Sequence, residues 1–261
     1  MLLAVDIGNT NITLGLWHNN EWVASWRART VPDKMPDEYG VLVNSFLSSQ
    51  NFDYRSVSSV VISSVVPALT PTFLELSHRY IEVEPIVVTH RTKMGIRIEI
   101  DQPEQAGADR LVNAAAVTAL YQCNAIVVDF GTATNFDIVS AEGAYCGGAI
   151  APGIGLAHDA LVARAAKLHK IDLLPPPNPI GRNTIHAMQS GIFWGYAALV
   201  EGMISRLKAA MRDAEMGDNI RVIATGGLAP LFRQHTNAID QIDPDLTLEG
   251  LRVIYQINAS A

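Results

Sequence analysis

Hydrophobic and polar residues alternate along the chain in a way that first predicts a β-hairpin. An apolar run at residues 2–5 ends in Asp6, a polar turn follows at 7–11, and apolar residues then recur at every second position up to Leu16. An apolar run before a tight turn and period-two alternation after it predict two strands joined as a hairpin. The first strand therefore ends with a carboxylate beside the turn.

The pattern after this hairpin predicts an alternation of strands and helices. In the first half, strands are expected at 21–30, 57–66 and 85–88, and helices at 37–50 and 68–80. A connecting helix rich in alanine is expected at 104–121. In the second half, strands are expected at 125–129, 134–139, 144–150 and 220–224, and helices at 152–168 and 183–212. The two halves thus follow a similar order.

The hairpin pattern itself occurs twice. Residues 126–139 align without gaps on residues 3–16, so that Asp129 stands where the first copy has Asp6. Self-similarity at about half the chain length predicts a duplicated domain. We expect an α/β fold with domains at residues 1–120 and 121–261, each a mixed β-sheet with flanking helices. The cleft between two such layers is the expected ligand site.

Each hairpin has residues suited to a phosphate site. Gly8 lets the backbone approach a ligand closely, while the turn N–H groups, the Asn9 amide and the Thr10 hydroxyl can face phosphate oxygens. Asp6 would then hold a hydrated Mg²⁺ beside those oxygens. A single hairpin of this kind is explained equally well as an ordinary turn. Two copies favour a nucleotide site.

Other glycine-rich segments stand at expected element ends. Residues 107–110 are expected to start the connecting helix, with Asp109 in a first turn, where a carboxylate complements the helix dipole. Residues 147–153 follow a strand and enter a helix, whose N-terminal N–H groups suit an anion or the backbone of a nucleotide. Residues 225–227 follow another strand and suit packing under an adenine or ribose, although plain turn chemistry explains both segments as well. The proline-rich residues 174–184 predict a rigid surface loop, with Asn183 or Thr184 capping the next helix.

Composition favours a compact soluble globule. The chain has 261 residues, of which 49% are hydrophobic and 17% charged, enough for one large domain or two. A net charge of −7 argues against a nucleic-acid partner. Cys123 and Cys146 make neither a disulfide framework nor a zinc site. Because the first apolar run breaks at Asp6 and no apolar stretch is long enough to span a bilayer, we expect a cytoplasmic protein with no membrane partner.

Taken together, the motifs resemble one known family. Residues 6–10, 107–110, 129–133 and 147–153 stand in the order and spacing found in the type III pantothenate kinases. The resemblance covers Leu2 to about Phe232. It implies duplicated ribonuclease-H-like domains of the acetate-kinase/sugar-kinase/Hsp70/actin group, assembled as a homodimer. It also implies transfer of the ATP γ-phosphate to the primary hydroxyl of pantothenate, which gives 4'-phosphopantothenate in the first step of coenzyme A synthesis.

The resemblance implies roles for individual residues. The general base is expected at Asp109, and the ligand of a monovalent cation, K⁺ or NH₄⁺, at Asp129. Mg²⁺ is expected at Asp6, through water. The nucleotide contacts fall on Asp6, Ile7, Gly8, Asn9, Thr10, Asn11, Ile12, Thr13 and Thr132. The pantothenate contacts fall on Gly107, Ala108, Asp109, Arg110 and Thr184, the last from the partner subunit, which places the substrate site near the dimer interface.

One residue departs from the family pattern, and two alternative functions stay open. Ile100 takes a position that is often aromatic, which keeps an apolar wall for pantothenate but loses a hydroxyl contact. The chain could be a kinase of the same fold acting on another small alcohol, or a non-catalytic regulator or accessory factor on the same scaffold. Phosphoryl transfer needs positioned reactants, charge neutralisation and a proton acceptor. Because all three carboxylates are present (Asp6, Asp109 and Asp129), catalysis is favoured.

Overall fold

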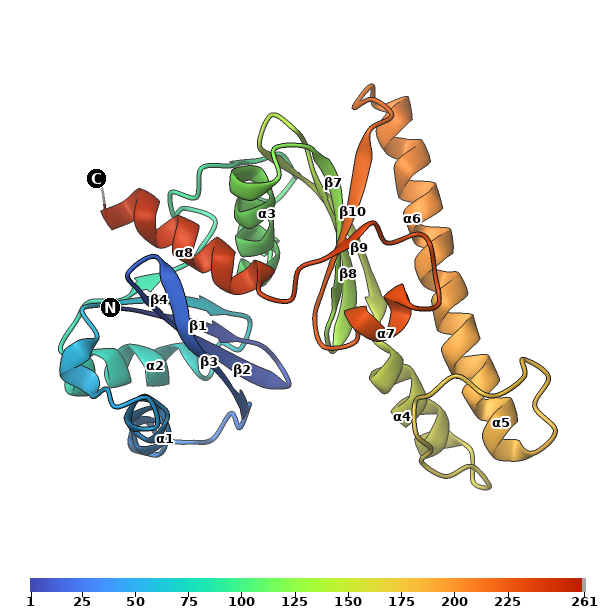
Figure 1. The fold of residues 1–261 in the computed structure, drawn as a ribbon, viewed down its shortest axis with the longest axis horizontal. Coiled ribbons are helices and arrows are strands. Elements are labelled where there is room, and N and C mark those ends of the chain that lie inside the picture. The colour runs from blue at the N-terminus through green and yellow to red at the C-terminus, as the bar shows by residue number, and fades with distance from the viewer. Residues whose placement is uncertain (260–261) are drawn as a thin grey trace. The chain divides into compact units, whose positions relative to one another are not determined.

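The computed structural model describes residues 1–259, and they form two compact units, each built around a β-sheet (Figure 1). The first unit comprises residues 1–122, 143–145 and those from 245 onward. The second comprises residues 123–142 and 146–244. The last segment of the chain therefore packs with the first unit.

The sheet of the first unit has the strand order β3-β2-β1-β4-β5. Its strands are β1 (Leu2–Ile7), β2 (Asn11–His18), β3 (Glu21–Arg29), β4 (Ser59–Ser64) and β5 (Ile86–Val87). β1 runs antiparallel to β2 and parallel to β4. Helices α1 (Pro36–Ser48) and α2 (Thr70–Leu76) lie on one face. On the other face α3 (Ala108–Leu120) contacts β4, and α8 (Leu246–Ala259) contacts both β1 and β4 (Figure 1).

Alternation along β1 decides which side chains face which helices. Leu3, Val5 and Ile7 belong to the core beneath α1 and α2. Since successive side chains of a strand point to opposite faces, Asp6 points to the face covered by α3 and α8. Asp6 interrupts an otherwise apolar strand on that side, where Leu2 and Ala4 are buried. The first hairpin thus carries its carboxylate toward α3.

Helix α8 packs closely on α3. A Cβ atom on Gly250 of α8 would lie 2.1 Å from the Val112 carbonyl oxygen of α3, so only glycine allows this approach. Thr247 Oγ1 also donates to Asn113 Oδ1 at 2.9 Å. Trp22 Nε1 of β3 donates to Glu249 Oε1 at 2.7 Å, which ties α8 to the sheet. The final helix of the chain therefore helps to fix the position of α3.

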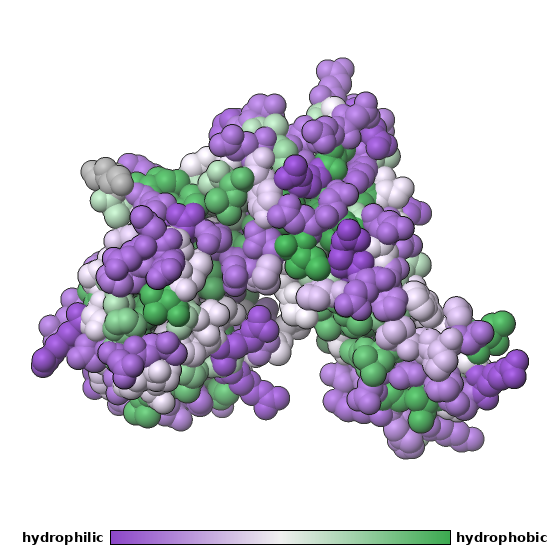
Figure 2. Space-filling model, in the orientation of Figure 1, coloured by the Kyte–Doolittle hydropathy of each residue, from purple (hydrophilic) through white to green (hydrophobic). Residues whose placement is uncertain are grey.

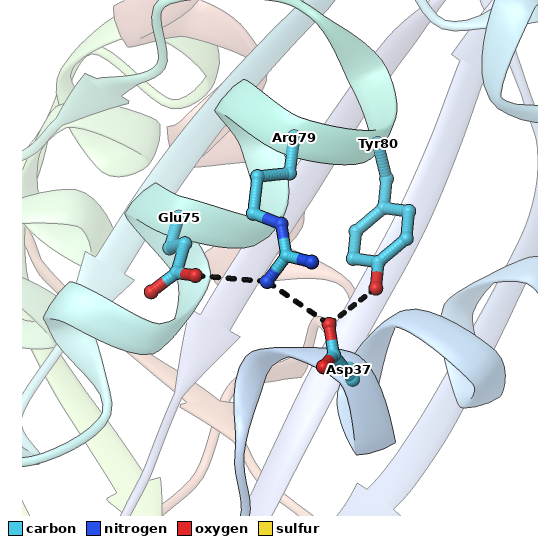
Figure 3. Close-up of polar contacts among 4 residues, drawn as sticks. All are labelled: Asp37, Glu75, Arg79 and Tyr80. Carbon is cyan, nitrogen blue, oxygen red and sulfur yellow. Dashed lines mark hydrogen bonds and ion pairs between the residues drawn. The ribbon is translucent and has the colours of Figure 1, made fainter.

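Polar contacts at the surface link α1 to the end of α2 (Figure 3). Asp37 of α1 accepts hydrogen bonds from Arg79 Nη1 at 3.1 Å and from the Tyr80 hydroxyl, and Arg79 Nη1 also lies 3.0 Å from Glu75 Oε1. Arg79 and Tyr80 belong to a π-helical turn, Ser77–Ile81, that continues α2. Because these groups are exposed, water screens their charges and they contribute little to stability.

The sheet of the second unit repeats the topology of the first. Its strands follow the order β9-β8-β7-β10-β11, with β7 antiparallel to β8 and parallel to β10. Their bounds are β7 (Asn124–Phe130), β8 (Ala133–Val139), β9 (Ala144–Pro152), β10 (Ile220–Thr225) and β11 (Gln241–Ile242). A short strand, β6 (Arg97–Ile98), pairs with Ala144 and Tyr145 at the start of β9. The duplicated α/β architecture predicted from the sequence is confirmed.

The gapless alignment of the two hairpins, however, is wrong beyond the turn. In the first hairpin Asp6 pairs with Thr13, whereas in the second Asp129 pairs with Asn135. The second turn is one residue shorter, because Gly131 N donates to Ala133 O while Gly8 N donates to Asn11 O, each at 3.0 Å. The sequence pattern did not reveal this difference, because the polar turn residues have no hydrophobic periodicity that would fix the turn length. The structural equivalent of the buried Leu14 is therefore Phe136, which is also fully buried.

The helices of the second unit are α4 (Ile154–Arg164), α5 (Thr184–Gln189), α6 (Gly195–Asp213) and α7 (Ala229–Arg233). A π-helical turn, Ser190–Trp194, joins α5 to α6, so the predicted helix at 183–212 is close to continuous. Asn183 caps it, with Oδ1 accepting from His186 N at 2.8 Å. The connecting helix starts at Ala108, within the expected starting segment 107–110 and not at 104, because Pro103–Gln105 form a 3-10 turn. Helices α7 and α8 were not predicted.

Within residues 1–259, none of the helices combines the length and the apolar character that crossing a bilayer requires.

Candidate active site

The first hairpin presents a polar tip above a buried base. Asn9, Thr10 and Asn11 are exposed, while Ile7 and Ile12 are fully buried in the core. The turn is held by Thr30, whose Oγ1 donates to the Gly8 carbonyl at 2.6 Å and whose N–H donates to the Thr10 carbonyl at 3.0 Å. Of the residues predicted to contact a nucleotide, Ile7 and Ile12 can offer only backbone groups.

Asp6 and Asp109 lie near each other although 103 positions separate them in the sequence. Burial, and to a lesser degree the negative charge of Asp109, together raise the pKa of the Asp6 carboxyl to about 7. Burial also raises the pKa of Asp109, whereas a hydrogen bond from the Arg110 N–H, at 2.8 Å, and the Arg110 charge lower it. The fold thus gathers two carboxyl groups at the carboxyl end of β1, where α3 begins.

Gly107 makes room for the Asp109 carboxyl. Its φ of −60° and ψ of 138° are open to any residue, so the backbone does not require glycine here. A Cβ atom at this position would lie 2.6 Å from Asp109 Oδ1 and 3.6 Å from Val65, which follows β4. Only the absence of a side chain at Gly107 lets the carboxyl fold back over the start of α3.

Arg110 lies beside Asp109 and contacts an aromatic ring of the first unit. Its guanidinium Cζ lies 5.7 Å from the ring centroid of Tyr145, which is almost fully buried. This arrangement is a cation–π contact that holds the long side chain beside Asp109. Tyr145 was not expected near the site, since its sequence pattern is that of an ordinary strand residue. Ile100 is half-buried in the segment after β6.

The second hairpin is set among close backbone contacts. Gly153, at the start of α4, donates from its N–H to the Thr132 carbonyl at 3.1 Å, and a Cβ on Gly153 would lie 2.4 Å from that oxygen. A Cβ on Gly226, which has a φ of +89°, would lie 2.5 Å from the Phe130 carbonyl oxygen. The glycine segments at 147–153 and 225–227 therefore pack against the hairpin.

Asp129 and Thr132 occupy different places on this hairpin. Asp129 is half-buried at the end of β7, in register with the buried Thr225 of β10, whereas Thr132 is exposed at the tip. Thr134 and Tyr196 share a buried hydrogen bond between their hydroxyls below the tip, and burial raises the pKa of the Tyr196 phenol. As in the first hairpin, the turn is exposed while the residues below it are buried and held by contacts.

Thr184 lies elsewhere in the second unit, as the first residue of α5. It lines an open groove of about 680 Å³ whose walls are mainly apolar. The lining residues are Leu161, Leu168, Gly181, Arg182, Asn183, Thr184, Ala187, Met188, Gly191 and Ile192. The polar side chains of this groove therefore come from the loop before α5 and from the first residue of that helix.

The side chains at the hairpins fit hard cations. Mg²⁺ is commonly held by one or two carboxylates together with substrate phosphates and water. Asp6 fits that role because its Oδ1 is enclosed and has no hydrogen-bond partner in the described part of the chain. Asp129 offers a carboxylate next to a threonine hydroxyl at Thr225, which are oxygen donors of the kind that hard cations prefer.

Comparison with known proteins gives one consistent family. The sequence profile of the type III pantothenate kinases matches residues 2–206. A type III pantothenate kinase from Moorella thermoacetica is 48% identical over 258 residues, which are 99% of this chain and 100% of that protein.

Solved structures share the fold at low identity. A Baf family protein from Campylobacter jejuni, named as a transcriptional activator, is 19% identical with a TM-score of 0.63, covering 99% of this chain and all of that one. An inorganic polyphosphate/ATP-glucomannokinase from an Arthrobacter species is 15% identical with a TM-score of 0.51, covering 100% and 99%. These similarities, with the repeated sheet, confirm the duplicated ribonuclease-H-like fold. The profile match and the near-half identity over the whole chain show that this chain belongs to the type III pantothenate kinase family.

Proposed function

We propose that this chain transfers the γ-phosphate of ATP to the primary hydroxyl of pantothenate, with Asp109 as the general base. Family membership supports the kinase activity and the substrate. The observation that carries the assignment of the base is the pair of carboxyls, Asp6 and Asp109, gathered where β1 ends and α3 begins. We assign Arg110 to pair with a substrate anion, and its contact with the Tyr145 ring supports this by holding the side chain beside Asp109.

The raised pKa of Asp109 suits proton transfer. The primary alcohol must lose its proton as its oxygen bonds to phosphorus, and a carboxylate within hydrogen-bond reach accepts that proton. Burial makes the Asp109 carboxylate a stronger base than an exposed aspartate. Gly107 and Ala108, beside it, are proposed to contact pantothenate through their backbone, and Ile100 to form an apolar wall.

We assign the nucleotide contacts to the hairpin residues. They comprise Asp6 to Thr13 in the first unit and Thr132 in the second. Mg²⁺, when bound at Asp6, supplies positive charge that offsets the phosphates, and K⁺ or NH₄⁺ is proposed at Asp129. The chain's own residues orient the phosphates through the turn backbone and the exposed Asn9 and Thr10 side chains.

The apolar surface of the second unit supports a homodimer. Among the described residues, six of the nine exposed large hydrophobic side chains fall between positions 150 and 185. They are Ile150, Leu156, Leu161, Leu174, Ile180 and Ile185. Figure 2 shows hydrophobic residues at the surface over this α4–α5 part of the unit. A second copy of the chain is the proposed occupant, because it would cover these side chains and bring Thr184 to the partner's pantothenate.

We also propose that the duplication boundary lies near residue 120, with domains 1–120 and 121–261. Helix α8 then comes from the second domain and packs on the first unit. We propose a cytoplasmic location for the protein.

A coupled assay of ADP release tests the function. With ATP and Mg²⁺, release should require pantothenate, and should fall when K⁺ is replaced by Na⁺. The Asp109→Asn variant should bind ADP normally and lose roughly 10²–10⁴-fold in turnover. ADP release that ignores pantothenate would contradict the substrate, and near-normal turnover of the variant would contradict the base.

A further inference from the structure

Ser63 is a buried polar residue that the sequence pattern did not single out. It lies in β4 directly opposite Asp6 of β1, and its side chain is fully buried. Val60 and Ile62 belong to the core beneath α1 and α2, so by alternation Ser63 points to the same face of the sheet as Asp6. That face carries α3 and the Asp109 carboxyl.

The Ser63 hydroxyl has no completed hydrogen bond. Neither Ser63 Oγ nor Asp6 Oδ1 has a partner among residues 1–259, and both atoms are closed off from water. Ser63 nevertheless acts on the Asp6 carboxyl as a hydrogen-bond donor does, since it lowers the pKa that burial raises. A buried hydroxyl without a hydrogen-bond partner destabilises the folded state, so a serine at this position calls for a functional reason.

We infer that Ser63 is a positioning residue for Asp6, donating its hydroxyl hydrogen to the Asp6 carboxylate when that group faces Mg²⁺. The inference rests on the proposed role of Asp6 in holding the cation. An ionised carboxylate is a stronger acceptor than the protonated form, and a hydrogen bond to it is also worth more than a neutral one. The two unpaired groups on adjacent strands would then satisfy each other in the nucleotide-bound protein.

A structural role alone does not account for this placement. Alanine would fill most of the same space without leaving a buried donor unpaired. The neighbouring Ser64 shows the contrast, since its Oγ accepts from the Val66 N–H at 3.3 Å and from Thr70 Oγ1 at 2.9 Å. Ser63 differs in having Asp6 as the acceptor that it can reach.

Calorimetric titration of ADP, with Mg²⁺ and with EDTA in its place, tests the inference on the full chain. The wild type should bind ADP more tightly with Mg²⁺. In Ser63→Ala this gain should fall about tenfold, the loss expected for a hydrogen bond to a charged group, while affinity in EDTA stays unchanged. Ser63→Cys fills the space but is a weak donor, so it should lose nearly as much as alanine.

Ser59→Ala is the matched control. Ser59 lies on the same strand and the same face, about 13 Å away, and its Oγ bonds the Tyr255 hydroxyl at 3.0 Å. This variant should keep the full Mg²⁺ gain. A full gain in Ser63→Ala, or wild-type behaviour of Ser63→Cys beside a defective alanine, would overturn the inference alone. A wild type with no Mg²⁺ gain would instead overturn the cation role of Asp6 and the inference with it.

Discussion

Replacing Gly107 by alanine tests the position of the Asp109 carboxyl, the proposed general base, with little change to the rest of the fold. The backbone angles at Gly107 suit alanine, and the new Cβ would meet Val65 at an ordinary 3.6 Å. Its one bad contact is with Asp109 Oδ1, at 2.6 Å. Ordinary contact begins at 3.4 Å, so that oxygen must move by about 0.8 Å, which a rotation of the Asp109 side chain provides.

The expected effect on catalysis follows from that displacement. A misplacement of about 1 Å at a reacting group costs on the order of 10²-fold in rate. We therefore expect kcat of Gly107→Ala to fall roughly 10- to 100-fold, or about 1.4–2.7 kcal/mol in activation free energy. Stability should not fall, because only a side-chain end moves and alanine reduces the conformational freedom of the unfolded chain.

The assay combines steady-state kinetics, ADP titration and thermal unfolding. Gly195→Ala is the control, because a Cβ there meets nothing within 4 Å. Gly107→Ala should lose kcat while ADP affinity and Tm match the control. If kcat is unchanged, Asp109 Oδ1 is not the acceptor whose position matters. A fall in Tm of several degrees would show that the glycine is needed for folding, and the positional argument would then fail.

Three further predictions concern the acid pair, the second hairpin and the apolar groove. The pKa of Asp6 is raised from 3.8 to about 7, so the stability of the ligand-free protein should fall as pH rises from about 4 to about 7. Asp6→Asn should reduce this slope in Tm measured against pH, and the raised pKa of Asp109 should account for what is left. Gly226→Ala should unfold several degrees lower, since alanine at a φ of +89° also meets the Phe130 backbone, and an ordinary Tm would refute this. Leu161 is 40% exposed and lines the apolar groove beside Thr184, on the surface proposed to bind a second copy of the chain. Leu161→Asp should therefore give monomers in light scattering with an unchanged circular dichroism spectrum. A persistent dimer would place the interface elsewhere.

Local pattern was sufficient to predict the hairpins and the duplication. An apolar run, an aspartate and a glycine turn form a local signal, and two copies of it half a chain apart imply two similar sheets. The one-residue difference between the turns was hidden, because polar turn residues carry no periodicity from which to count. Asn183 was predicted as one of two possible caps, with Thr184, for the same local reason, since its side chain bonds a backbone group three residues later.

What depends on tertiary packing could not be predicted. The closeness of Asp6 and Asp109 depends on where α3 lies, and that position depends on Gly250 of a helix that the sequence pattern did not reveal. Ser63 was overlooked because a serine in a β-branched run has no distinctive pattern. The packing of Gly153 and Gly226 against the hairpin explains both residues without a ligand, which the sequence left open.

The return of α8 to the first unit has a consequence for synthesis. The ribosome completes the strands of that unit early, but α3 meets Gly250 and Thr247 only after the whole second unit has emerged. At a translation rate of about 5–20 residues per second, the face of α3 that packs on α8 stays uncovered for on the order of ten seconds. A nascent chain halted before α8 would expose that face to chaperones and proteases. Activity should therefore appear only after α8 has been synthesised and has packed on α3.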